Sequence, residues 1–187
     1  MLGFKKKLIK KLVTHDGSFH ADDIFACATL SILLENKKDK FEIIRTRNPE
    51  IIKKGDFVFD VGGIYDEKLN RFDHHQTGGA GNHGGIEYSS FGLVWKKFGI
   101  ELCGSQKVVD VLDEKLAIPV DAGDNGISLF ELKNKTMPYL IQSAFNSFVP
   151  GWKNVSEETL FSGFLECVEI AKKILSNEID RARDVIE

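Results

Sequence analysis

Short apolar strands alternate with helical segments through the first 75 residues, and this alternation restricts the fold more than any other feature of the sequence. "KLVTHDG" (11–17) is typical of a strand that runs into a turn, and Asp22 to Asn36 then carries apolar residues at helical spacing. Further strands are predicted at "FEIIRT" (41–46), at "DFVFDVGG" (56–63), where a buried strand ends at Asp60, and at "RFDHH" (71–75). The pattern predicts an α/β fold, a mostly parallel sheet flanked by helices on both faces.

The second half of the chain is predicted to be mainly helical. Thr77 to Gly85 is predicted to form a flexible loop with five glycines, and a helix is expected over 89–99. The segment 105–126 is expected to begin as a further helix that ends before Pro119. From about Pro138 the chain again favours helix, with 156–186 as one long or broken amphipathic helix. We expect a single catalytic domain over 1–187, with a core at 11–135 and a helical C-terminal extension at 136–187.

Composition excludes several classes of protein. A hydrophobic content of 42% and a charged content of 28% are ordinary for a folded globular chain. The longest apolar run, Ile24 to Leu34, is well short of the roughly 20 residues of a membrane span. Three scattered cysteines argue against a disulfide framework or a cysteine zinc site, so we expect a cytoplasmic protein without a membrane segment. A net charge of −3 does not support indiscriminate binding of nucleic acid.

Aspartates and histidines gather where the apparent strands stop. The carboxyl ends of parallel strands share one crevice, so side chains from distant segments can converge there. The segments concerned are "THDGSFHADD" (His15, His20, Asp22, Asp23), "FDVGG" (Asp60), "FDHH" (Asp73, His74, His75) and "VDAGDN" (Asp121, Asp124).

Imidazole and carboxylate groups without thiolates suit Mn²⁺, Fe²⁺, Co²⁺ or Zn²⁺, and the number of carboxylates is enough to bridge two ions. Two such ions could clamp the oxygens of a phosphate during hydrolysis of a phosphoester or phosphoanhydride. Glycines such as Gly62 and Gly63 allow the backbone to approach a ligand, and the glycine loop could fold over a phosphate. Taken singly, Asp60 or Asp121 is more commonly a helix cap or turn former, and His83 more commonly a solvated loop residue. The prediction of a metal site therefore rests on finding all these aspartates and histidines together at the predicted strand ends.

At these residues the sequence resembles the DHH phosphoesterase superfamily and, within it, the Myg exonuclease family. The matching segments are "THDGSFHADD", "DVGG", "RFDHHQ", "YSSFGLVWKKFG" and "DAGDNG". The resemblance implies a fold like that of the DHH N-terminal domain and two divalent ions, with Mn²⁺ favoured, Mg²⁺ also usual in the family, and Co²⁺, Fe²⁺ or Zn²⁺ possible.

The resemblance also implies a role for each matched residue. Its metal ligands would be His15, His20, Asp22, Asp60 as the bridging carboxylate, His74 and Asp121. Its catalytic group would be His75 facing the substrate phosphate, Asp73 orienting its neighbours, and Asp23 as an outer base or helix-start residue. Phosphate binding is expected at Gly62, Gly63, Gly78, Gly79 and His83.

The function that the resemblance implies is a 3′-to-5′ exonuclease acting on RNA or short single-stranded oligonucleotides. Two alternatives stay open: a hydrolase of pyrophosphate or small nucleotides, and a non-catalytic protein that binds metal or nucleotide. Longer members of the family continue into a second domain that closes over substrate, which we expect to be absent from this chain. A partner subunit could take the place of that domain as one wall of the cleft, so a homo-oligomer is a further hypothesis.

Overall fold

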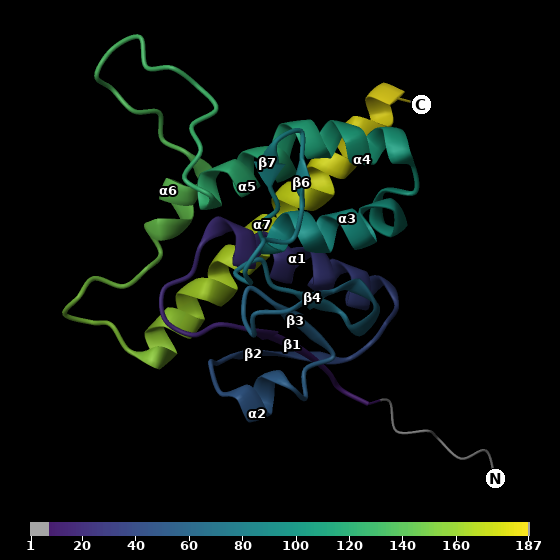
Figure 1. Ribbon diagram of the computed structural model, residues 1–187, viewed down its shortest axis with the longest axis vertical. Coiled ribbons are helices and arrows are strands. Elements are labelled where there is room, and N and C mark those ends of the chain that lie inside the picture. Colours follow the sequence, from purple (N-terminus) through teal and green to yellow (C-terminus); the bar gives the residue numbers. More distant parts are fainter. Residues whose placement is uncertain (1–7, 187) are drawn as a thin grey trace.

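A mostly parallel sheet lies at the centre of the protein, whose computed structural model describes residues 8–186 (Figure 1). The strand order is β2-β1-β3-β5-β4. β2, β1, β3 and β5 run parallel, and β4 pairs antiparallel with β5 at the edge. The strands of this sheet are β1 Lys10–Thr14, β2 Phe41–Arg45, β3 Phe57–Phe59, β4 Tyr65–Asp66 and β5 Arg71–Phe72. A separate antiparallel ribbon is formed by β6 Asn82–His83 and β7 Ile86–Glu87.

Helices make up most of the rest of the described chain. They are α1 Ala21–Asn36, α2 Pro49–Ile52, α3 Ser90–Cys103, α4 Gln106–Leu112, α5 Ile118–Asp124, α6 Ile141–Asn146 and α7 Glu157–Ile186, with a 3-10 turn at Glu67–Leu69 and a π-helical turn at Asp113–Ala117. The predicted α/β class and the helical C-terminus are confirmed.

The topology creates a crevice at the carboxyl end of the sheet. The chain passes from β1 through α1 to β2 on one side of β1, and then returns to place β3 on the other side. The strand order therefore reverses direction between β1 and β3. In open α/β sheets, ligand sites form outside the strand ends at such a point.

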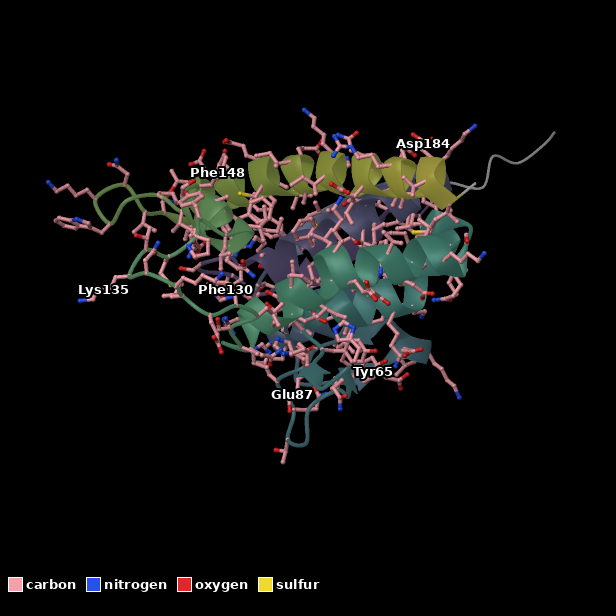
Figure 2. The ribbon with its side chains drawn as sticks, turned by 90° about the horizontal axis from the view of Figure 1, so that it is seen from above. Tyr65, Glu87, Phe130, Lys135, Phe148 and Asp184 are labelled. Carbon is pink, nitrogen blue, oxygen red and sulfur yellow. The ribbon has the colours of Figure 1, made fainter. Side chains whose placement is uncertain are left out.

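The main core lies between the sheet and the helices, and α1 is its centre. Most of the side chains of α1 are buried, and this helix contacts both α3 and α7. Figure 2 shows side chains filling the space between α7 and the helices beneath it. α7 is amphipathic, as predicted, and it begins with a reciprocal capping interaction, since the Thr159 amide donates to Ser156 Oγ at 3.1 Å and the Ser156 amide donates to Thr159 Oγ1 at 2.9 Å.

The prediction of helices on both faces is only partly right. The face opposite α1 is covered by the four-residue α2, whose Ile52 packs against a small cluster of Val13, Val58 and Val61 (Figure 1). A short helix suffices there because few apolar side chains point to that side of the short strands.

Three local predictions were wrong. The helix expected to end before Pro119 continues, because a π turn at Asp113–Ala117 leads directly into α5, with Pro119 in its first turn, where a residue without an N–H is tolerated. "VDAGDN" is therefore part of a helix and its following turn, and not a strand end. The strand predicted at 71–75 stops at Phe72. The predicted glycine loop includes β6, and β7 begins directly after it.

Two general expectations concern redox state and membranes. Cys27, Cys103 and Cys167 are free thiols inside the protein, and burial raises the pKa of Cys103 to about 11. Within residues 8–186, no helix combines the length and apolar character that crossing a bilayer requires.

Candidate metal centre

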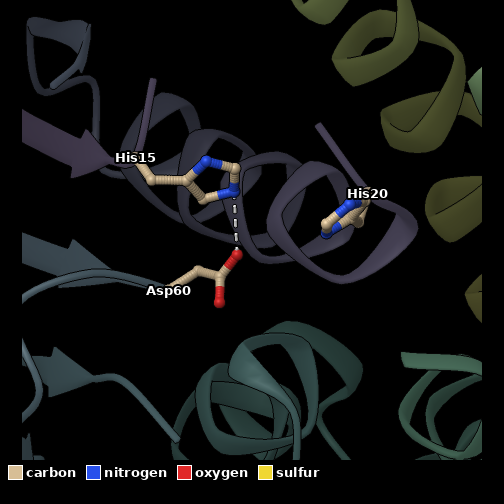
Figure 3. Close-up of side chains that lie close together, drawn as sticks. All are labelled: His15, His20 and Asp60. Atoms are coloured by element: carbon tan, nitrogen blue, oxygen red, sulfur yellow. Dashed lines mark ion pairs between the residues drawn. The ribbon is translucent and has the colours of Figure 1, made fainter. Parts of the chain in front are cut away.

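Side chains that follow β1, β3 and β5 converge at the carboxyl end of the sheet. His15 directly follows β1, Asp60 directly follows β3, and His74 lies two residues beyond β5. Asp60 joins the two histidines: its Oδ2 lies 3.0 Å from His15 Nε2, and its Oδ1 lies 3.2 Å from His74 Nε2. Figure 3 shows the His15 contact and places His20, from the start of α1, beside it. One carboxylate thus presents each of its oxygens to a different imidazole.

The backbone at Asp60 is unusual. Its φ is 54°, in the left-handed region that residues with a side chain seldom occupy. The Asp60 amide donates to the Phe72 carbonyl at 3.2 Å, which fixes this residue against the neighbouring strand, and Gly62 and Gly63 follow at φ 100° and 68°. An uncommon conformation held by its surroundings is a frequent property of functional sites. Here it directs the carboxylate into the crevice.

His15 is buried and its ring orientation is set by the next residue. Nδ1 lies 2.8 Å from the Asp16 carbonyl oxygen, to which it can only donate, so Nε2 is the nitrogen that faces the carboxylates of Asp23 and Asp60. Burial lowers the pKa of His15, but the two carboxylates outweigh it and raise that pKa to about 10. A cation, either a proton or a metal ion, is therefore strongly favoured at Nε2.

The second side of the centre lies around His74. Its Nε2 is 3.4 Å from Asp124 Oδ2 and 4.0 Å from Asp22 Oδ2, in addition to the Asp60 contact. Burial opposes a charge on His74, yet Asp60 and Asp124 raise its pKa. Burial and neighbouring carboxylates also raise the pKa values of Asp22 and Asp124. Negative charge is thus crowded at this point.

The donors fit divalent ions. Three groups of side chains offer ligand atoms within 4.8 Å of one another: His15, His20 and Asp60; Asp60, His74 and His75; and His20, Asp22 and Asp124. Asp60 and His20 each belong to two groups, as expected of ligands between adjacent ions. Asp22 Oδ1 is buried without a hydrogen-bond donor, and the buried Asp23 Oδ2 faces the imidazole of His15 at 3.2 Å. Buried carboxylate oxygens without a donor are costly, and a bound cation would satisfy them.

Asp23 lies at the start of α1, which is one of the two roles that the sequence suggested for it. Its Oδ1 accepts from the His20 amide at 2.9 Å, the arrangement of a residue that caps the start of a helix. Its Oδ2 lies 3.2 Å from His15 Nε2. Asp23 therefore fixes the beginning of α1 with one carboxylate oxygen and places the other beside Nε2 of His15.

Asp73 and His75 form a pair at the opening of the crevice. The buried Asp73 accepts from the Gly63 amide at 2.6 Å and from the His75 amide at 3.0 Å, and its Oδ1 also lies 2.8 Å from His75 Nδ1. The His75 side chain is 63% exposed. Asp73 thus holds the ring by one nitrogen while the rest of the ring faces solvent.

Asp121 is not brought together with His74. It is fully buried on α5, where its Oδ1 accepts from the Ser89 hydroxyl and from the Gly92 amide, the latter at 3.1 Å. Its Oδ2 lies 2.9 Å from His83 Nε2. Asp124, which the sequence marked at the same segment without a role, occupies the position beside His74. The two aspartates are three residues apart on one helix, so the sequence did not distinguish them.

A cleft of about 760 Å³ opens over the centre. Gly62 and Gly63 line it, together with His75 and the exposed side chains of Arg47 and Glu87. A smaller cavity of about 240 Å³ adjoins it through His20 and Asp124. Gly78, Gly79 and His83, predicted as phosphate-binding residues, line neither of these spaces. Gln76 instead closes the turn at Gly79 by donating from Nε2 to the Gly79 carbonyl at 2.7 Å.

Comparison with known proteins gives a consistent result. Residues 11–186 match the family model of the MYG1 exonucleases, described as uncharacterised protein family UPF0160. The chain is 32% identical over 193 residues to the MYG1 exonuclease of Bos taurus, covering 91% of this chain and 49% of that protein. It is 31% identical over 193 residues to the MYG1 exonuclease of Homo sapiens, covering 91% of this chain and 50% of that protein.

A bacterial relative, the MYG1 protein of Chlamydia pneumoniae, is 40% identical over 120 residues, which cover 63% of this chain and 38% of that protein. The chain spans about half the length of the two mammalian relatives. No solved structure matches it.

Proposed function

Because the chain belongs to the MYG1 exonuclease family, we propose that it hydrolyses phosphodiester bonds of nucleic acid with divalent ions held at the crevice. The observation that carries the proposal is the position of Asp60, whose two oxygens face His15 and His74 beside the buried Asp22, which has an oxygen without a hydrogen-bond donor. Placement in the DHH phosphoesterase superfamily is part of the same proposal.

Two ions would share the centre. His15, His20 and Asp60 would hold one, and Asp22, Asp60, His74 and Asp124 the other. When bound, such ions supply Lewis acidity that activates water and neutralises charge on a phosphate. Mn²⁺ is our first choice because the resemblance to the DHH phosphoesterases favours it, and a donor set of imidazole and carboxylate without thiolate is compatible with it.

The protein's own side chains would position the substrate. His75 would contact a phosphate oxygen, and Asp73 would hold its ring in the required orientation. Gly62 and Gly63 would let the substrate backbone pass close to the sheet edge, since neither carries a side chain into the cleft. We propose single-stranded RNA as the substrate and 3′-to-5′ as the direction of shortening.

The experiment is a cleavage assay on metal-stripped protein supplied with Mn²⁺, using RNA labelled at its 5′ end and pyrophosphate in a parallel reaction. A ladder of shortened, still labelled products indicates 3′-to-5′ action, whereas immediate release of a labelled mononucleotide indicates the opposite polarity. Asp60→Asn should abolish the reaction, and Asp180→Asn, which removes an exposed carboxylate of α7, should not. Cleavage of pyrophosphate alone would favour the small-molecule alternative, and inertness toward both would contradict the proposal.

Association of two copies and a cytoplasmic location stay predictions. Light scattering on the purified protein over a range of concentrations tests the first, and imaging of a tagged copy in cells tests the second.

A further inference from the structure

The cleft over the metal centre carries almost entirely acidic and imidazole side chains. Its charged lining consists of aspartates, histidines, Glu87 and Arg47, and among the described residues Arg47 is the only lysine or arginine in that lining. A phosphodiester chain brings one negative charge for each phosphate into these surroundings. Ions at the centre would neutralise the phosphate that lies there, and Arg47 is the remaining positive group in the cleft.

The residues on both sides of Arg47 hold its backbone in place at the rim of the cleft. The Thr46 amide donates to the Thr14 carbonyl at 2.8 Å, which continues the β1–β2 pairing for one residue beyond the strands. On the other side, Asn48 caps α2 by accepting from the Glu50 amide at 2.9 Å. The backbone of Arg47 is therefore fixed between two hydrogen-bonded neighbours.

The guanidinium is oriented by Asp16. Arg47 Nε lies 3.2 Å from Asp16 Oδ1, while the Asp16 carbonyl accepts from His15. Asp16 thus links the position of Arg47 to that of a predicted metal ligand. The Arg47 side chain remains 66% exposed, and the recorded ion pair uses Nε. The terminal nitrogens of a guanidinium match the oxygens of a phosphate in a forked arrangement.

Arg47 also lies apart from the carboxylates of the centre. Its ion pair is with Asp16, and no ion pair joins it to Asp22, Asp23, Asp60 or Asp124 among the described residues. We propose that Arg47 binds the phosphate next to the scissile one, so that the cleft selects substrates with at least two phosphates, as in an oligonucleotide. This inference rests on the proposed function and specifies its substrate class.

Two measurements test it. The first is equilibrium binding of a labelled ten-nucleotide single-stranded RNA, with Ca²⁺ in place of Mn²⁺, over a series of salt concentrations. Arg47→Ala should weaken binding about tenfold or more at low salt and reduce the slope of log affinity against log salt by about 0.7, the value for one contact to a single strand. Arg47→Lys should lose part of this affinity because it keeps the charge and not the fork.

The second measurement compares two substrates in Mn²⁺. Arg47→Ala should lower kcat/KM for the RNA at least fivefold more than kcat/KM for bis(p-nitrophenyl) phosphate, which contains a single phosphate. The matched control is Arg181→Ala, because Arg181 is similarly exposed at 73% and pairs with Glu178 on α7, outside the cleft lining. Metal content and thermal midpoint of each variant show whether the centre is intact.

The outcomes separate this inference from the proposed function. Normal RNA binding by Arg47→Ala, or equal losses on both substrates, would overturn the assignment of Arg47 even though the wild type cleaves RNA. A wild type that binds RNA without cleaving it would contradict the proposed function, and the binding series would still decide for or against Arg47. A wild type that does not bind RNA would overturn both.

Discussion

Exchanging one charge at a time on α5 would separate a metal ligand from a structural aspartate. Asp121 and Asp124 lie three residues apart, and Asp→Asn at either position removes one charge with almost no change of shape. The structure gives them different surroundings: Asp124 faces His74, and Asp121 accepts from Ser89 and Gly92.

The expected magnitudes follow from these contacts. Asp121→Ala leaves two buried donors without an acceptor, and at about 1–3 kcal/mol for each the loss of stability is about 2–6 kcal/mol. Asp121→Asn keeps an acceptor oxygen for both donors and loses only the charge, so its cost should be about 1–2 kcal/mol. Asp124→Asn should cost less stability than Asp121→Asn in the metal-free protein, because burial and Asp60 raise the pKa of the Asp124 carboxyl and disfavour its charged form, although His74 acts in the opposite direction.

Metal affinity should show the opposite order. Asp124→Asn should weaken Mn²⁺ binding at least about tenfold, since change of even an outer partner of a ligand commonly has that effect. Asp121→Asn should bind nearly as the wild type does. Urea unfolding in the presence of a chelator measures stability, and titration calorimetry measures affinity. Weak metal binding by Asp121→Asn with normal binding by Asp124→Asn would refute the assignment made from the geometry.

Three further predictions concern other parts of the structure. In the metal-free protein, kept so by a chelator, the pKa of His15 is raised from 6.5 to about 10 by its ion pairs with Asp23 and Asp60. The stability that these ion pairs contribute is complete below about pH 6.5 and is lost as the pH rises through about 10. The thermal midpoint of the protein should therefore fall over that pH range, and it should fall less in His15→Gln. Asp73→Ala removes the carboxylate that accepts from the partly buried Gly63 amide and releases His75, so it should cost about 1–3 kcal/mol, the range for hydrogen bonds to a charged group, and lower the rate of hydrolysis more than the metal content. Arg45→Ala removes a guanidinium that lies 4.7 Å and 5.5 Å from the centres of two phenyl rings, each contact being worth about 0.5–2 kcal/mol, and urea unfolding should show a loss of about 1–4 kcal/mol. A thermal midpoint that does not change with pH would contradict the prediction for His15. Equal losses of metal content and rate in Asp73→Ala would contradict the second prediction, and an unchanged urea transition in Arg45→Ala would contradict the third.

The sequence predicted the part of the centre that depends on strand ends. His15 and Asp60 follow strands that are adjacent and parallel, and His74 follows a third, so the rule that such ends share a crevice brought them together correctly. The rule needs only the period of the apolar residues and the parallel direction of the strands, and both can be read from local sequence.

The residues on α5 show where such prediction stops. Pro119 suggested the end of a helix, but a π turn before it let the helical path continue, and a single inserted residue in the hydrogen-bond pattern leaves no clear trace in composition. Whether Asp121 or Asp124 reaches the crevice depends on the rotation of α5 about its axis. That rotation is set by packing against α3, which brings the Gly92 amide to Asp121. Arg47 was missed for a related reason, since its role depends on the acidic lining around it.

If ions bind at the crevice as proposed, the distance along the chain between their donors would tie folding of the protein to its supply of metal. Side chains that meet around Asp60 come from the segments that directly follow β1, β3 and β5 and from α5, so an ion bound there would hold segments that an unfolded chain keeps far apart. An ion that binds only the native state, present at 100 times its dissociation constant, would add about 2.7 kcal/mol to the free energy of unfolding. Without the ion, the same carboxylates repel one another inside the protein. Metal starvation would then lower the amount of folded protein as well as its rate of reaction, and proteolysis of the newly made chain would report the metal content of the cell.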